Sequence, residues 1–157
     1  MTISFGYEKK QVLQALRYHF LTRPEIRILL ILVNVFAILS AILFAFKKIQ
    51  PLPFLFFSVL WFILILVIWK ILPGSIYRKA MTFKDHFTMQ FLDNEVRLEN
   101  ERGVKAWEYS VFSKFVESPN FFHLYFDSRS FFLVPKDAFR DITDMQDTRK
   151  LLKEKIR

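Results

Sequence analysis

The chain has 157 residues, 53% of them apolar, and a formal net charge of +8. This length fits one domain of ordinary size, or a smaller domain with an accessory segment, and the apolar content excludes a disordered chain. Cysteine is absent. Its absence excludes a disulfide framework and cysteine-based metal or nucleophile chemistry, and it suits a reducing compartment.

The positive charge is concentrated in the N-terminal half of the chain. Residues 1–77 contain eight Lys or Arg and two Glu, a net charge of +6. Residues 78–157 contain fifteen Lys or Arg and thirteen Asp or Glu, a net charge of +2. Because the excess lies beside the most apolar part of the chain, we expect it to face anionic lipid headgroups, and we expect no nucleic-acid partner.

The N-terminal segment predicts a short strand followed by a basic amphipathic helix. Ile3, Phe5 and Tyr7 alternate with small or polar residues, which is the period of a strand. In residues 8–22 apolar side chains recur every four positions, so this helix is expected to lie along a membrane interface or to pack on a folded domain. Pro24 ends it, because the residue before a proline disfavours the helical conformation.

Two stretches without charged residues follow, 28–46 with 19 residues and 49–69 with 21. Each is long enough to cross a hydrocarbon core of about 30 Å as a helix. Helices buried in a soluble core keep a polar face, and these stretches have almost none. We therefore predict two transmembrane helices, at about 28–46 and 50–69. Asn34 and Ser40 are expected to tie the helices together by hydrogen bonds.

The two spans are predicted to form an antiparallel hairpin. Pro51 and Pro53 lie where the second helix would begin, a position that tolerates a missing N–H. Five basic residues precede the first span and four follow the second, against two lysines in the turn. This distribution places both termini in the cytoplasm. Lys70, Arg78 and Lys79 are nearest the membrane and are the candidate contacts to lipid headgroups.

The C-terminal half predicts a small α+β antiparallel roll with a C-terminal helix. Strand candidates separated by turn residues lie at 86–92, 95–100, 104–110, 111–117, 121–127 and 130–134. Short strands this close together indicate an antiparallel meander. Thr143 and Gln146 resemble a capping box that begins the helix, with Met145, Leu152 and Ile156 along one face.

No arrangement of residues predicts a reaction or a metal site. The three histidines lie in different elements without ligand spacing, and His123 is expected to occupy one face of a strand. The three glycines are not spaced for a phosphate-binding loop. We predict no catalytic residues, no metal and no cofactor. His86, His123 and Glu108 are the remaining candidates should the chain be an enzyme.

An apolar hairpin followed by "VKAWEYSVFSKFVESPNFFHLYF" and "FFLVPKDAF" resembles the YcxB-like family of bacterial membrane proteins. The C-terminal part of that family is similar to a pleckstrin-homology-like (PH-like) roll. The resemblance covers nearly the whole chain and is most specific at Gly103–Trp107 and Val134–Phe139. Glu108 and Tyr109 depart from the small polar residue and acid that family members often show, so the turn there is expected to differ.

Four residues of these segments are expected to be structural anchors. Pro135 ends the last strand, because proline cannot donate to a strand ladder. Phe132 lies in that strand, and Phe139 is expected to fold back onto the sheet. Trp107 is interpreted as part of the core rather than as a ligand platform. The resemblance implies no catalytic residue.

The chain is therefore divided into an N-terminal strand and helix (1–24), a transmembrane hairpin (25–72) and a cytoplasmic PH-like domain (78–157). The N-terminal strand is expected to cover an open edge of the domain's sheet, because open edges invite aggregation. The expected function is a non-enzymatic protein of the bacterial inner membrane that presents the PH-like module for binding a protein partner or lipid headgroups. The alternatives are a membrane immunity protein that protects against a toxin and, third, a lipid-modifying enzyme. The sequence leaves the oligomeric state open.

Overall fold

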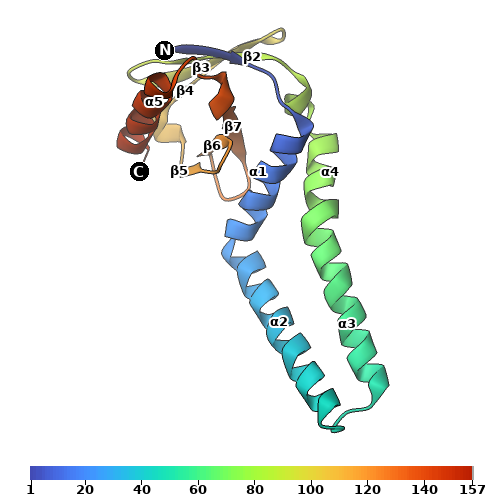
Figure 1. Ribbon diagram of the computed structural model, residues 1–157. Coiled ribbons are helices and arrows are strands. Elements are labelled where there is room, and N and C mark those ends of the chain that lie inside the picture. Colours follow the sequence, from blue (N-terminus) through green and yellow to red (C-terminus); the bar gives the residue numbers. More distant parts are fainter. Residues whose placement is uncertain (157) are drawn as a thin grey trace. The chain divides into compact units, whose positions relative to one another are not determined.

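The structure is a computed structural model and describes residues 1–156 (Figure 1). Its contacts divide the chain into two compact units. The β-rich unit consists of Met1–Ala15 together with the chain from Ala80 onward, and the helical unit is Leu16–Lys79. Helix α1 (Lys9–Thr22) begins in the first unit and ends in the second.

The first sheet of the β-rich unit includes the N-terminal strand. Strands β1 (Thr2–Phe5), β2 (Phe87–Phe91), β3 (Glu95–Asn100) and β4 (Gly103–Glu108) lie in that order, and all neighbours are antiparallel. In β1, Ile3 and Phe5 are buried while Thr2 and Ser4 are exposed, which is the alternation that the sequence showed. The expectation that this segment would pair along a sheet edge is confirmed.

The second sheet has three antiparallel strands, β5 (Lys114–Glu117), β6 (Phe121–Tyr125) and β7 (Phe131–Pro135). Consecutive strands pair antiparallel as predicted, but the predicted meander is divided between two sheets by the 3₁₀ turn η3 (Tyr109–Val111). Within the turn, the Phe112 N–H donates to the Tyr109 carbonyl at 3.1 Å. The Tyr109 hydroxyl also donates to the Leu92 carbonyl at 2.9 Å, which anchors the turn to the end of β2.

Both sheets and the C-terminal helix α5 (Ile142–Lys155) contribute to one hydrophobic core. Aromatic rings dominate it, and Phe5, Phe87 and Phe132 lie with centroids 5.7–6.4 Å apart. From α5, Leu152 is fully buried, and Ile156, just beyond the helix, is also in the core. This confirms the predicted inward face of the helix.

The N-terminus of α5 differs from the prediction. Asp141 is the N-cap, and its Oδ1 accepts a hydrogen bond from the Asp144 N–H at 2.8 Å. The proposed capping box beginning at Thr143 is therefore wrong, because Thr143 already lies inside the first turn. An aspartate carboxylate at the N-cap satisfies the same free N–H groups and complements the helix dipole.

In the helical unit, α2 (Pro24–Ala45) and α3 (Pro51–Leu66) form an antiparallel hairpin (Figure 1). Helix α3 begins with Pro51, as the sequence predicted. Helix α2 begins with Pro24, which was predicted only to end the preceding helix. The Trp61 indole Nε1 donates to Asn34 Oδ1 at 3.3 Å, so Asn34 does link the two helices. Ser40 does not. Its hydroxyl is buried and has no hydrogen-bond partner among the described residues, so that part of the prediction is wrong.

The second helix of the hairpin is longer than predicted. It continues from α3 through a π-helical turn, η1 (Val67–Ile71), into α4 (Leu72–Lys79). The hairpin was predicted to end at residue 72, but the backbone remains helical across Pro73 and Gly74. The π turn lies directly before Pro73, where a regular helix would lose a hydrogen bond.

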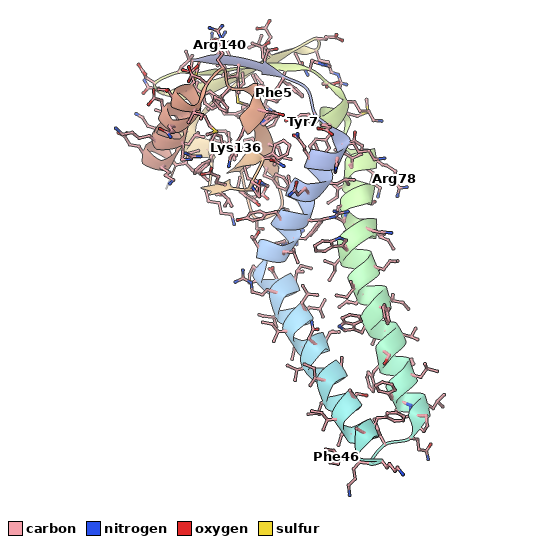
Figure 2. All side chains as sticks on the ribbon, viewed as in Figure 1. Phe5, Tyr7, Phe46, Arg78, Lys136 and Arg140 are labelled. Atoms are coloured by element: carbon pink, nitrogen blue, oxygen red, sulfur yellow. The ribbon has the colours of Figure 1, made fainter. Side chains whose placement is uncertain are left out.

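The hairpin exposes its apolar side chains. Helix α2 and the continuous helix Pro51–Lys79 are long and apolar enough to cross a membrane, and only 6% of the most apolar window of each is buried. The side chains project outward along both helices (Figure 2). Helices buried in a soluble core would be covered, so that alternative does not describe this structure. Two long apolar helices and an antiparallel β-rich unit are thus the fold class.

Candidate functional site

The predicted headgroup contacts lie on the second helix of the hairpin. Lys70 is in the π turn η1, and Arg78 and Lys79 occupy the last turn of α4, where cations complement the helix dipole. All three side chains are exposed, and none forms an ion pair within residues 1–156. The charges are therefore available to a ligand.

Pro73 explains the π turn η1, which contains Lys70 and directly precedes α4. In an α-helix the N–H of residue 73 would donate to the carbonyl of residue 69, and proline has no N–H. The backbone widens instead, and the Leu72 N–H donates to the carbonyl of Val67, five residues earlier. The Trp69 carbonyl therefore lacks its usual helical donor, and it accepts a hydrogen bond from a side chain of α1 instead.

That side chain is Arg17, a residue that the sequence did not single out. Its Nε donates to the Trp69 carbonyl at 3.0 Å, and its guanidinium carbon lies 5.3 Å from the centre of the Trp69 ring. The contact joins α1 to the second helix inside the helical unit. Pro73 four residues after Trp69 is the signal that an N–H donor would be missing there, although the sequence does not say which side chain replaces it.

The β-rich unit holds one partly buried charge cluster, at Glu117. Arg149 of α5 donates to Glu117 through Nε at 2.9 Å and through a terminal nitrogen at 2.7 Å, and Lys136 Nζ lies 2.6 Å from the same carboxylate. Partial burial raises the pKa of Glu117, but the hydrogen bonds from Arg149 and Lys136 outweigh it and hold that pKa below its ordinary value. The cluster joins α5 to the three-stranded sheet and is a structural contact.

The four expected anchors lie in or against the core. Phe132 and Phe139 are buried, and the half-buried Trp107 ring lies 5.5 Å from Phe126 and 6.2 Å from Phe132. Pro135 is the last residue of β7. The next residue, Lys136, donates its N–H to the Asn120 carbonyl at 2.9 Å, so the Pro135 corner is held by the backbone.

The remaining enzyme candidates occupy separate places. His123 is fully buried on β6, and its Nε2 lies 2.8 Å from Ser118 Oγ, as expected for a residue inside a sheet. His86 lies against Gly6, where an added Cβ would approach the imidazole to 3.0 Å. Glu108 ends β4 and accepts a hydrogen bond from Ser110. His86 and Glu108 line different hollows.

Two tyrosines have perturbed ionisation for structural reasons. Burial raises the pKa of Tyr7 well above its ordinary value, and its hydroxyl donates to the Leu133 carbonyl at 2.6 Å. Burial and the nearby Asp93 carboxylate raise the pKa of Tyr109 to about 12. Both hydroxyls stay protonated and donate to backbone carbonyls. Among the residues that the structure describes, no group of three or more His, Cys, Asp or Glu could hold a metal ion.

Comparison with known proteins finds a family match within the β-rich unit. Residues 91–152 match the model of the YcxB-like protein family. The match runs from the end of β2 into α5 and includes both of the specific segments, Gly103–Trp107 and Val134–Phe139, so it confirms the resemblance there. No curated protein and no solved structure matches the chain. The family match and the two apolar helices are compatible with a membrane protein.

Proposed function

We propose that the protein is a non-enzymatic, two-span protein of the bacterial inner membrane that holds its β-rich unit at the cytoplasmic surface as a PH-like binding module. One observation carries the proposal: the two longest helices expose nearly all of their apolar side chains. In water such a surface would drive aggregation, whereas in a lipid bilayer it is the favourable surface. The YcxB-like match over residues 91–152 is compatible with a membrane protein.

Of the two expected ligands, lipid headgroups have better support than a protein partner, and basic residues of the second helix of the hairpin are the contacts that favour them. Lys70, Arg78 and Lys79 directly follow the apolar part of the second helix, and they are exposed without an acidic partner within residues 1–156. Anionic lipids on the cytoplasmic leaflet attract such residues by about 1 kcal/mol for each positive charge near the surface. If both termini are in the cytoplasm, the end of the second helix is also on the cytoplasmic side, and these three residues contact the headgroups of the cytoplasmic leaflet.

Membrane extraction and lipid analysis test this proposal. The full chain should remain in carbonate-washed membranes, and purification as a soluble monomer without detergent would contradict it. The triple variant K70Q/R78Q/K79Q should co-purify with less anionic phospholipid than the unmodified protein. The control K105Q/K114Q/K150Q removes the same charge from the β-rich unit. An equal loss in both variants would show that net charge, and not the residues beside the second helix, attracts the lipid.

A further inference from the structure

We propose that Arg17 binds the phosphate group of an anionic phospholipid, and that the Trp69 carbonyl, which Pro73 leaves without its helical donor, holds Arg17 in position for it. The inference rests on the membrane placement of the proposed function. It adds a residue from α1, a different element from the one that carries Lys70, Arg78 and Lys79.

The position of Trp69 places the Arg17 guanidinium at the level of the headgroups. Trp69 is the last residue of the second charge-free stretch, and Lys70 is the first charged residue after it. Tryptophan is enriched at this boundary because its ring is apolar and its N–H is polar. Trp69 is 47% exposed, so its ring is open to lipid. The guanidinium, 5.3 Å from that ring, therefore lies where the phosphate groups of the lipids are found.

The guanidinium is fixed in direction before any ligand binds. Its Nε is used by the Trp69 carbonyl at 3.0 Å, and its plane is held near the indole ring. The two terminal nitrogens make no other hydrogen bond with the described residues, and Arg17 forms no ion pair within residues 1–156. Those nitrogens form the fork that binds two phosphate oxygens. Because the Arg17 side chain is already held in one orientation, it loses less conformational entropy when it binds a phosphate.

A purely structural role would not require this residue type. The carbonyl that Pro73 leaves without its donor needs a single N–H, which a glutamine or lysine side chain can also supply. A guanidinium brings a full positive charge and four further N–H donors to the edge of the apolar surface of the hairpin, and such a charge is stabilised by an anion. No carboxylate of the described chain supplies one. The anion concentrated at this depth is the phosphate of a phospholipid, and it leaves a net negative charge only in an anionic lipid, because the choline of phosphatidylcholine offsets its phosphate.

Fluorescence quenching by brominated lipids tests the proposal on the full chain. The variant W61F leaves Trp69 as the reporter beside Arg17, and W61F/W69F gives the background from Trp107. The protein is reconstituted in mixed phosphatidylcholine and phosphatidylglycerol vesicles in which either lipid carries bromine on its acyl chains. The extent of quenching by each brominated lipid gives the relative binding constant of the two lipids at Trp69.

Arg17→Gln should lower the preference for phosphatidylglycerol about fivefold, the effect of one well-placed positive charge. Arg17→Lys keeps the charge but loses the fork, and it should lose most of the preference as well. Arg27→Gln is the matched control, since Arg27 is an exposed arginine of the same unit; it should change the preference less than twofold. An equal loss in the Arg27 and Arg17 variants, or full preference in Arg17→Lys, would overturn the proposal.

Pro73→Ala provides a second test that leaves Arg17 intact. It restores the N–H that the Trp69 carbonyl lacks, so Arg17 is no longer held, and the preference should fall as in Arg17→Lys. An unchanged preference would contradict the role of Pro73. Addition of inorganic phosphate should have no effect, and loss of the preference on its addition would identify a soluble ligand instead. Equal quenching by both lipids would overturn the phosphate site alone, whereas no quenching of Trp69 by either lipid would also overturn the membrane placement.

Discussion

Phe5→Ala tests whether the strand before the apolar helices is part of the β-rich fold. Phe5 lies on β1, which pairs with β2 in antiparallel register, and its ring is 7% exposed. It contacts Tyr7, Phe87 and Phe132 with ring centroids 5.6, 6.0 and 6.4 Å away. The substitution therefore removes a ring from the place where the N-terminal segment meets both sheets (Figure 2).

The expected loss is large for this unit. Replacing a buried phenylalanine by alanine costs about 3–5 kcal/mol, and the lower end applies to a strand at the sheet edge. Domains of this size have a free energy of unfolding of about 5–15 kcal/mol, so about 3 kcal/mol is a substantial part of it. With a urea dependence of about 1.5 kcal/mol per molar, the unfolding midpoint should fall by about 2 M.

Urea unfolding followed by Trp107 fluorescence measures this loss. In the background W61F/W69F, Trp107 is the remaining tryptophan and packs against the core through Phe132. Ser4→Ala is the matched control, because Ser4 is the exposed neighbour on the opposite face of β1; it should change the free energy of unfolding by less than about 0.5 kcal/mol. Equal midpoints for Phe5→Ala and Ser4→Ala would refute the reasoning.

Two further substitutions probe α5. Glu117→Gln should destabilise the β-rich unit by about 1 kcal/mol at neutral pH, because its carboxylate binds Arg149 and Lys136 and is partly exposed. The pKa of Glu117 is lowered in the folded state, so its contribution is present above the unfolded pKa of about 4.3 and is lost as the pH falls through the folded pKa. Urea unfolding of both proteins should thus show a difference that shrinks in acid; a constant difference would contradict it. Asp141→Ala should cost about 1 kcal/mol as a lost N-cap, and an equal loss in Thr143→Ala would instead support the capping box.

The features that sequence predicted best are those with a local and repeated physical cause. The charge-free stretches identified the two long helices because a helix that exposes apolar side chains needs no matching partner elsewhere in the sequence. Ile3 and Phe5 alternate with polar residues, so β1 was predicted, and its place along a sheet edge followed from the need to cover that edge, although the structure was needed to identify β2 as its partner. The start of α3 at Pro51 was predicted because a proline at the first helical position affects only the first turn.

The features that sequence missed depend on contacts between distant residues. Tyr109 turns the chain out of the first sheet because its hydroxyl reaches Leu92, a contact that no local pattern announces. The hairpin was predicted to end at residue 72, yet the helix continues past Pro73 because the backbone widens into a π turn and Arg17 donates to the Trp69 carbonyl from 52 residues away. At α5, both Asp141 and Thr143 are good N-cap residues, and the backbone conformation decides for Asp141.

The most direct test of the proposed membrane placement is thiol labelling of single cysteine variants in intact cells. The natural chain has no cysteine, so Thr2→Cys, Gln50→Cys and Lys155→Cys each carry one reactive thiol. Gln50 precedes α3 in the hairpin turn, and the other two positions report on the ends of the chain. A membrane-impermeant thiol reagent should label only the Gln50 variant, and all three should react after the cells are opened. Labelling of the Lys155 variant in intact cells would contradict the proposed orientation.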